Sequence, residues 1–168
     1  MKRRRAYGIA AGGLVVAAVL GVILVTAGGE EKPRSRQYGA FTSCLLTDEA
    51  GIGGPAAAPA WAGMQDASLA SLTKVQHLSV IGEQTTDNAG TFVASMVQSR
   101  CNLVVLSGQA PGAAATAASA RFPAQQFVAV GDQPSDSRAN VTWVAGSPDA
   151  VRIKVRDAVL DAARAAER

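Results

Sequence analysis

Two adjacent carboxylates, Asp48 and Glu49, stand between an apolar run and a glycine-rich stretch. An aspartate and a glutamate can serve as general acid and base when both face one reacting group. Neighbouring residues point in different directions, however, and no third catalytic group accompanies this pair. We interpret both side chains as loop acids that accept hydrogen bonds, and we expect the chain not to be an enzyme.

The glycines that follow suggest a second chemistry. Residues 51–56, Gly-Ile-Gly-Gly-Pro-Ala, match the G-x-G-x-x-G/A pattern of dinucleotide-binding turns, and Glu83 follows the next apolar run, where an acid that holds a ribose would stand. Asp48 and Glu49 would then lie beside a pyrophosphate, and like charges oppose binding. A Rossmann-type dinucleotide-binding domain is therefore the less favoured alternative.

The sequence offers few metal ligands or nucleophiles. His77 is the one histidine, and Cys44 and Cys101 are the two cysteines, so a four-ligand site of histidine and cysteine cannot be built. His77 is interpreted as a surface residue on an edge strand. No metal and no cofactor are expected.

Five short apolar runs alternate with alanine-rich segments of helical spacing, which predicts βαβ units and a parallel sheet. The fold class is therefore α/β: a three-layer, Rossmann-like open parallel sheet. The predicted strands are residues 41–47, 75–81, 103–106, 126–130 and 141–144, and the predicted helices are 55–72, 88–99, 111–120 and 147–168.

Two details support this assignment. The last helix has Ser147 as N-cap and Pro148 at its first position, with an apolar face that begins at Val151. Ile153 and Leu160 fall on its far side, as isolated exposed residues or as a contact for a partner. Trp61 and Met64, three residues apart on the first helix, are predicted to belong to the core, with a ligand platform as the alternative.

The N-terminal region predicts a membrane anchor. Residues 2–5 are Lys-Arg-Arg-Arg, residues 6–27 carry no charge, and about 20 apolar residues suffice for a spanning helix. The positive-inside rule leaves the basic flank (1–5) in the cytoplasm and the rest outside, after a linker at 28–39. Because Val25-Thr26-Ala27 is similar to a cleavage site, a secreted form cut after Ala27 is the alternative to a single-pass protein of the cytoplasmic membrane.

The charge balance argues against nucleic acid as a partner. The whole chain has a formal charge of +3, but from residue 40 onward it has 9 Lys plus Arg against 11 Asp plus Glu. The basic isoelectric point therefore belongs to the membrane flank, and the outer domain lacks the basic stripe that nucleic-acid binding requires.

Strand polarity and the cysteines together predict a sheet order. Polar residues interleave with apolar ones in 75–81, as at a sheet edge, while 103–106 is continuously apolar and suits the centre. The order 2-1-3-4-5 follows, with strands one and three adjacent and about 4.8 Å apart. Cys44 and Cys101 each lie near the start of one of these strands, so a disulfide is within reach outside the membrane, with two packed thiols as the alternative.

Several ordered motifs carry a family resemblance. They are Leu45-Leu-Thr-Asp48 with Gly51-Ile52, Trp61-Ala-Gly63-Met64, Asn102-Leu-Val-Val-Leu-Ser-Gly108, Phe122-Pro-Ala-Gln-Gln-Phe-Val-Ala-Val130 and Asn140-Val141. With them, residues 40–145 resemble the N-terminal lobe of the basic membrane protein (BMP) family, the nucleoside-type substrate-binding proteins of bacterial ABC importers. The corresponding family motifs are a "TDxGGI" turn, "WEGL", "DLIIGVG", "YPDQKFAII" and "NV".

The resemblance implies a lobe of the periplasmic-binding-protein type I fold, within residues 40–168, that holds its ligand at the carboxyl ends of the strands. The implied ligand-binding residues are Asp48, Gly51, Ser107, Gly108 and Asp132. Carboxylates accept hydrogen bonds from sugar hydroxyls, and glycines let the backbone approach a ligand. The implied partners are a nucleoside-like small molecule and an ABC permease or a protein that supplies a second lobe.

The chain also departs from the family pattern. Where the family has acids, a lysine, a phenylalanine and an asparagine, residues 53–60 are Gly-Gly-Pro-Ala-Ala-Ala-Pro-Ala. The loss of a stacked aromatic side chain removes about 1–3 kcal/mol of base binding. The resemblance covers one lobe only, so we expect no second lobe in this chain, and no lipobox cysteine follows the apolar run 6–27. We therefore expect a solute-binding-like domain with weak nucleoside binding, and an extracytoplasmic sensor or interaction domain without a transport role as the alternative.

Overall fold

The computed structural model describes residues 37–168. The predicted basic flank (1–5), the predicted spanning helix (6–27) and most of the predicted linker (28–39) lie outside the described residues. Among the helices of residues 37–168, none combines the length and the apolar character needed to cross a bilayer.

A five-stranded sheet forms the centre of the described part. All its strand pairs are parallel and its order is β2-β1-β3-β4-β5, which confirms the predicted topology. The edge position of β2 agrees with its largely exposed residues, and the centre position of β3 agrees with its four buried ones. The strands are β1 (Thr42–Thr47), β2 (Lys74–Ser79), β3 (Leu103–Leu106), β4 (Gln126–Val130) and β5 (Val141–Val144).

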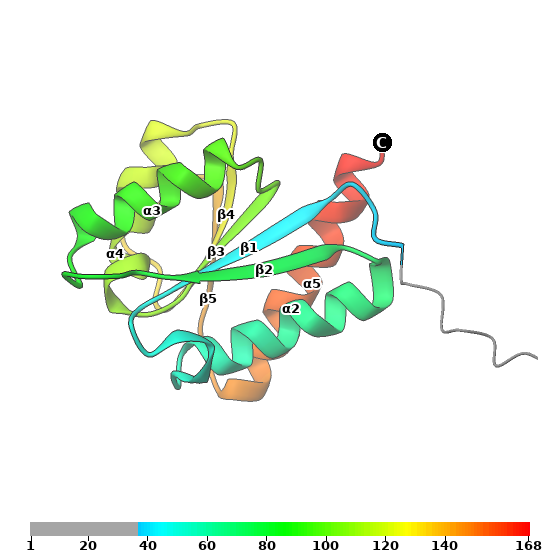
Figure 1. The fold of residues 1–168 in the computed structure, drawn as a ribbon, viewed down its shortest axis with the longest axis horizontal. Helices are drawn as coiled ribbons and strands as arrows, with labels where there is room; N and C mark the ends of the chain where they lie inside the picture. The colour runs from blue at the N-terminus through cyan, green and yellow to red at the C-terminus, as the bar shows by residue number, and fades with distance from the viewer. Residues whose placement is uncertain (1–36) are drawn as a thin grey trace, which may run out of the picture. The chain divides into compact units, whose positions relative to one another are not determined.

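Helices cover both faces of the sheet, as Figure 1 shows: α2 and α5 pack together on one face, and α3 and α4 on the other. The side chains of Thr85 and Ser147 cap α3 and α5 by accepting hydrogen bonds from the Asn88 and Ala150 amides. The elements are η1 (Gly51–Gly53), α2 (Ala57–Ser71), α3 (Thr86–Gln98), α4 (Gln109–Arg121) and α5 (Pro148–Ala166). Residues 131–140, between β4 and β5, contain neither helix nor strand.

The apolar face of α5 is largely as predicted. Val151, Val155 and Val159 are buried against the sheet, and Ile153 is 49% exposed. The prediction for Leu160 is wrong, because this side chain is half-buried and packs against the same core. Its position at the margin of the apolar stripe lets the long side chain reach the layer between α5 and the sheet.

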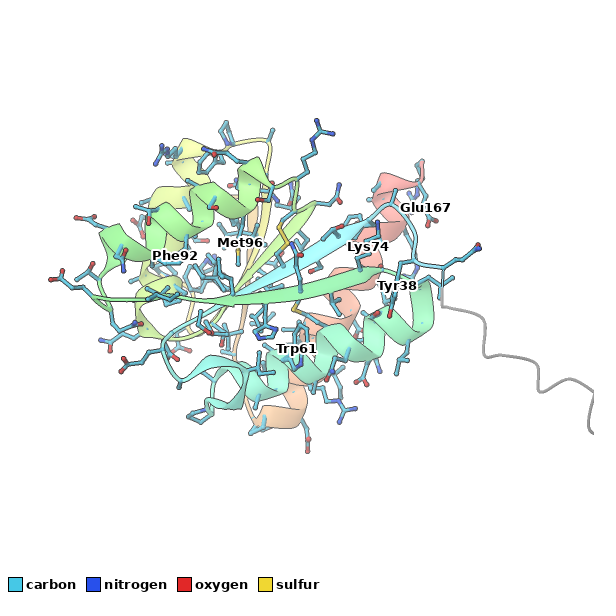
Figure 2. The ribbon with its side chains drawn as sticks, in the orientation of Figure 1. Tyr38, Trp61, Lys74, Phe92, Met96 and Glu167 are labelled. Carbon is cyan, nitrogen blue, oxygen red and sulfur yellow. A yellow bond between two sulfur atoms is a disulfide. The ribbon has the colours of Figure 1, made fainter. Side chains whose placement is uncertain are left out.

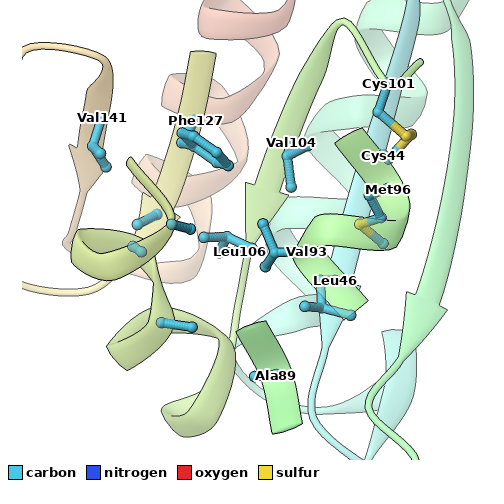
Figure 3. Close-up of a cluster of buried hydrophobic side chains, with 14 of the residues drawn as sticks. Cys44, Leu46, Ala89, Val93, Met96, Cys101, Val104, Leu106, Phe127 and Val141 are labelled. Carbon is cyan, nitrogen blue, oxygen red and sulfur yellow. A yellow bond between two sulfur atoms is a disulfide. The ribbon is translucent and has the colours of Figure 1, made fainter. Parts of the chain in front are cut away.

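Alternate strand residues fill two separate core layers. Leu46, Val104 and Phe127 pack under α3 and α4, as Figure 3 shows, while Leu45 and Val105 pack under α2 and α5. Every buried hydrophobic residue of the two layers lies between residues 44 and 163. Residues 37–168 form one compact unit with these two core layers, and we expect this fragment to fold alone.

A disulfide joins Cys44 on β1 to Cys101, two residues before β3, and confirms the predicted pairing. The Cα atoms are 5.8 Å apart, because β1 and β3 are neighbours in the sheet. Both cysteines are buried beneath α3, and the Gln76 amide nitrogen donates a hydrogen bond to Cys44 Sγ at 3.0 Å. The disulfide therefore links β1 to the segment before β3, near the end of the sheet where the strands begin.

The crossing of α2 and α5 is unusually close. A Cβ atom at Gly63 would overlap the carbonyl oxygen of Arg152 and lie 3.1 Å from the backbone nitrogen of Arg156. One turn along, Arg152 donates two hydrogen bonds to Asp66, at 2.7 and 2.9 Å. The hydrogen bond from Arg152 lowers the pKa of Asp66 below its ordinary value, and the same contact raises the pKa of Arg152.

The amino edge of the sheet, where all five strands begin, holds both ends of the described part. Residues 39–41 and the last residues of α5, Ala163 to Glu167, line a common hollow of about 190 Å³. Figure 2 shows Tyr38, Lys74 and Glu167 at this end of the molecule. The loops that carry the predicted ligand-binding residues lie at the opposite, carboxyl edge.

Candidate functional site

The carboxyl edge contains a topological switch point between β1 and β3. The chain leaves β1 toward α2 on one face of the sheet and leaves β3 toward α4 on the other. Loops that diverge in this way leave a crevice between them, and open α/β sheets bind ligands there. The predicted site residues come from the loops after β1, β3 and β4.

The structure brings Asp48 and Gly108 together at this switch point. A Cβ atom at Gly108 would lie 2.6 Å from Asp48 Oδ2 and 3.1 Å from Asp48 Cβ. Gly108 has φ +106° and ψ 169°, a conformation that is essentially restricted to glycine. The other carboxylate oxygen, Oδ1, accepts a hydrogen bond from the Ala50 amide at 3.1 Å. One oxygen of the Asp48 carboxylate therefore accepts a hydrogen bond within its own turn, and the other lies against Gly108, the N-cap of α4.

The other predicted residues near these two have different surroundings. Gly51 has φ +64° and lies toward β2, where a Cβ atom would be 3.5 Å from Ser79 Oγ. Ser107 is fully buried, and its hydroxyl has no hydrogen-bond partner among the described residues. Neither residue lines the hollows described below. A ligand role for Gly51 and Ser107 stays a prediction.

Asp132 lies where two hollows meet at the end of β4. The α5-side hollow, about 240 Å³, is bounded by the start of α2, the end of β5 and the start of α5. The α4-side hollow, about 350 Å³, is bounded by the first two turns of α4, Pro134 and Trp143. Val130, Gly131 and Asp132 line both hollows, so the loop after β4 forms the ridge between them.

The α4-side hollow has polar groups as well as an aromatic wall. No side chain caps the N-terminus of α4, and Gly108, Gln109 and Gly112 line this hollow together with Trp143. The first amides of a helix carry a partial positive charge. The Trp143 indole nitrogen donates to Ser137 Oγ at 2.8 Å, which fixes the ring at the wall. The polar side chains among its lining are Gln109, Thr116 and Asp132, and the Trp143 ring lies beside them.

Sequence reasoning missed Trp143 and Gln109. Trp143 belongs to a strand, and its pairing partner Ala129 precedes the β4 loop by two residues. The available signal was an aromatic residue near the end of one strand, Trp143, together with an acid, Asp132, just after the strand expected beside it. Gln109 gave no signal, because its place in the hollow follows from where α4 begins.

The hollows favour an uncharged or cationic ligand. Asp132 is the one ionisable side chain that lines either of them. Within residues 37–168, His, Cys, Asp and Glu side chains do not form a group of three that could hold a metal ion. A carboxylate among apolar walls accepts hydrogen bonds from hydroxyl or amino groups and repels anions.

The turn at residues 51–56 has the hydrogen bonding of a closed turn. The Gly51 amide donates to the Asp48 carbonyl, the Gly54 amide to the Gly51 carbonyl, and the Ala57 and Ala58 amides to the Gly54 carbonyl. A dinucleotide turn instead offers such amides to the pyrophosphate. This internal pairing, together with the Asp48 carboxylate, disfavours the dinucleotide alternative.

His77 and Trp61 form an edge contact away from both hollows. Their ring centroids are 5.1 Å apart at an interplanar angle of 63°. Met64 is fully buried, whereas Trp61 is half-buried beneath His77. Met64 thus belongs to the core layer under α2 and α5, as predicted, and Trp61 packs against that layer and against His77 on β2.

No protein-family model and no curated protein matches the chain. Among solved structures, a solute-binding protein of an ABC transporter system from Aeropyrum pernix K1 aligns with a TM-score of 0.52 and 18% identity, covering 61% of this chain and 28% of that one. A fragment of a protein described as a lipoprotein from Peptoclostridium difficile 630 aligns with a TM-score of 0.57 and 11% identity, covering 76% and 97%. The chain thus spans little more than a quarter of the solute-binding protein. These similarities show that residues 37–168 have a periplasmic-binding-protein-like fold.

Proposed function

We propose that this chain is a non-enzymatic recognition domain, displayed outside the cytoplasmic membrane, that binds its target at the carboxyl edge of the sheet. The observation that carries the proposal is the meeting of two hollows at Gly131 and Asp132, on the edge where open α/β sheets bind ligands. The periplasmic-binding-protein-like fold supports a small molecule as the target.

The proposal includes kinship with the BMP-type substrate-binding proteins and a need for a second component. Both hollows are open to solvent, and a small-molecule site normally encloses most of its ligand. A second lobe supplied by another protein, or an ABC permease that docks on this edge, would complete the enclosure. Because residues 53–60 lack side chains that discriminate a base, we expect nucleosides to bind more weakly than micromolar.

Calorimetry on residues 37–168 with guanosine tests the ligand site. We expect calorimetry to show weak binding. A second measurement follows the fluorescence of Trp143 in a Trp61→Phe background, where Trp143 is the one remaining tryptophan, and guanosine should alter this fluorescence. Asp132→Asn should remove the response, because Asp132 lines both hollows, whereas Glu49→Gln, an exposed acid on the same edge, should retain it. Micromolar or tighter affinity, or a response that survives Asp132→Asn, would contradict the proposal.

The membrane location has its own test. We propose that residues 6–27 hold the protein as a single-pass anchor with the N-terminus inside, or direct secretion when cleaved after Ala27. A reporter fused to the C-terminus should then be active outside the cytoplasm. Activity confined to the cytosol would refute both forms of this proposal.

A second candidate function is that of an extracytoplasmic sensor or interaction domain without a transport role. It is favoured by the α5-side hollow, whose lining is proline, alanine, valine and glycine with Asp132 as the one charge. Such a surface suits the side chains of a protein better than a sugar. Capture of a permease or of a second lobe by the wild-type domain, but not by Asp132→Asn, would favour the transport role over this one.

A further inference from the structure

The amino edge, opposite the candidate site, carries a patch that the proposed function does not use. Tyr38, Leu69 and Leu72 are exposed there, with Leu69 at 63% exposure. The Gly39 amide donates to the Leu72 carbonyl, and the Lys74 amide donates to the Phe41 carbonyl, so these segments are adjacent. We call the set of Tyr38, Leu69, Leu72, Lys74, Arg100 and Arg121 the amino-edge patch.

Hydrogen bonds join the strand starts beside which the three cations of the patch lie. Asn102 bonds to Thr42 through its amide and its side-chain oxygen, and Gln125 donates to the Asn102 carbonyl. Lys74 is the first residue of β2, Arg100 lies between α3 and β3, and Arg121 is the last residue of α4, so all three lie at the amino edge. Within residues 37–168 none of these three cations forms a salt bridge, and all three are exposed.

The charges of the domain are separated between its two edges. The loops of the carboxyl edge and the first two turns of its helices carry seven acids against Arg138, Arg152 and Lys154, and Glu167 is the acid next to the patch. Helix dipoles favour cations near helix C-termini and acids near N-termini, which accounts for part of this arrangement. They do not account for exposed Leu69, Leu72 and Tyr38 among the cations. The seven acids are Asp48, Glu49, Glu83, Asp87, Asp132, Asp136 and Asp149.

Two patch residues occupy positions that favour glycine. Leu72 has φ +57° and Arg100 has φ +61°, and they are the described non-glycine residues with positive φ. Leucine and arginine are disfavoured in this conformation, whereas glycine adopts it freely. One of these positions presents an exposed apolar side chain and the other a cation, both on the same edge. A side chain at a strained backbone position is a candidate for a role of its own.

We infer that the amino-edge patch docks on an anionic lipid surface. Cations interleaved with leucine and tyrosine are the chemistry of an interfacial membrane contact. The chain enters the domain at this patch, ten residues after the apolar run 6–27, and ten extended residues reach about 36 Å at most. The intervening residues add Lys32, Arg34 and Arg36 against Glu30 and Glu31, a net charge of +1. With the patch on the membrane, the hollows at Asp132 face away from it.

The predicted strength of this contact is modest and depends on salt. Each Lys or Arg near an anionic surface contributes about fivefold to partitioning, so Lys74, Arg100 and Arg121 together give about a hundredfold preference for anionic over neutral lipid. At physiological ionic strength charges are screened beyond about 8 Å, so added salt should release the domain. A tethered domain needs no tighter contact, because the tether keeps its local concentration high.

Co-sedimentation of residues 37–168 with vesicles tests the inference without the N-terminal region. The fragment should bind vesicles of phosphatidylcholine mixed with phosphatidylglycerol, and not vesicles of phosphatidylcholine alone. Leu72→Gly/Arg100→Gly should weaken binding at least tenfold without lowering the thermal midpoint, because glycine fits both backbone conformations. Ile81→Gly/Lys154→Gln removes one exposed apolar side chain and one cation from the carboxyl edge and should bind as the parent does.

Several results would overturn the inference. They are failure of the folded fragment to bind anionic vesicles, equal binding to both lipid compositions, or an equal loss in the carboxyl-edge control. Self-association that depends on Leu72 and Arg100, without vesicle binding, would assign the patch to a second copy of the chain. None of these results bears on guanosine binding, so the ligand proposal is judged separately.

Discussion

The close crossing of α2 and α5 makes a sharp prediction for Gly63→Ala. The added Cβ atom would overlap the Arg152 carbonyl oxygen and approach the Arg152 carbonyl carbon and the Arg156 nitrogen to 3.1 Å each. All three obstacles are backbone atoms inside a helix, so no side chain can rotate away. The two helices must move apart by about 1 Å, which loosens the dense layer of Met64, Val155 and Val159 between them.

The expected cost follows from two opposing terms. Forcing a methyl group into a packed interface costs about 1–3 kcal/mol, and rigid obstacles place Gly63→Ala at the upper end. Alanine in a helix interior is favoured over glycine by about 1 kcal/mol. The net loss in the free energy of unfolding should therefore be about 2 kcal/mol, measured by urea denaturation of residues 37–168.

Gly90→Ala on α3 is the matched control. A Cβ atom at Gly90 meets nothing within 4 Å, so Gly90→Ala changes stability only through the higher helix propensity of alanine. It should raise stability by about 0.5–1 kcal/mol. If Gly63→Ala were as stable as the parent, or if both substitutions shifted stability in the same direction, the close approach of the two helix backbones would be refuted.

Three further predictions concern stability. Cys101→Ser removes a disulfide between residues that are 57 positions apart, and the lost restriction of the unfolded chain should lower the free energy of unfolding by about 4 kcal/mol in urea denaturation. Reduction of the parent protein should reproduce this loss. Gly108→Ala should lower the free energy of unfolding by about 2 kcal/mol, because φ +106° excludes alanine; wild-type stability would contradict the turn geometry. Asp66→Asn should cost about 0.5 kcal/mol at neutral pH. Because the pKa of Asp66 is lowered by Arg152 in the folded state, that contribution is present above its ordinary value of 3.8 and is lost as pH falls through the lowered value, so a deficit that persists in strong acid would contradict the ion pair.

Much of the architecture could be predicted from local patterns. The runs 103–106, 126–130 and 141–144 coincide with β3, β4 and β5, because short apolar runs bounded by polar turns leave little freedom in strand limits. The mixed polarity of 75–81 was enough to place β2 at the edge. That order in turn put Cys44 beside the start of β3, and the disulfide followed from it.

What the sequence could not show depends on approach in three dimensions. Nothing in the local pattern around Gly63 indicates that the backbone of α5 passes against it, since the two helices are far apart in the sequence. Trp143 reaches the α4-side hollow because β5 pairs with β4, and Asp132 became the centre of the site because two hollows meet there. For Ser107, the order of the motifs predicted a ligand-binding residue but could not show that its hydroxyl is buried without a hydrogen-bond partner among the described residues.

The nearness of the two ends of the described part has a consequence for protein engineering. Residues 39–41 lie against the last residues of α5, so a short linker could join them without crossing the sheet. New termini could then open within residues 131–140, which contain neither helix nor strand. Such a circular permutant would keep every strand pairing and the disulfide, while placing a fused reporter directly beside Asp132.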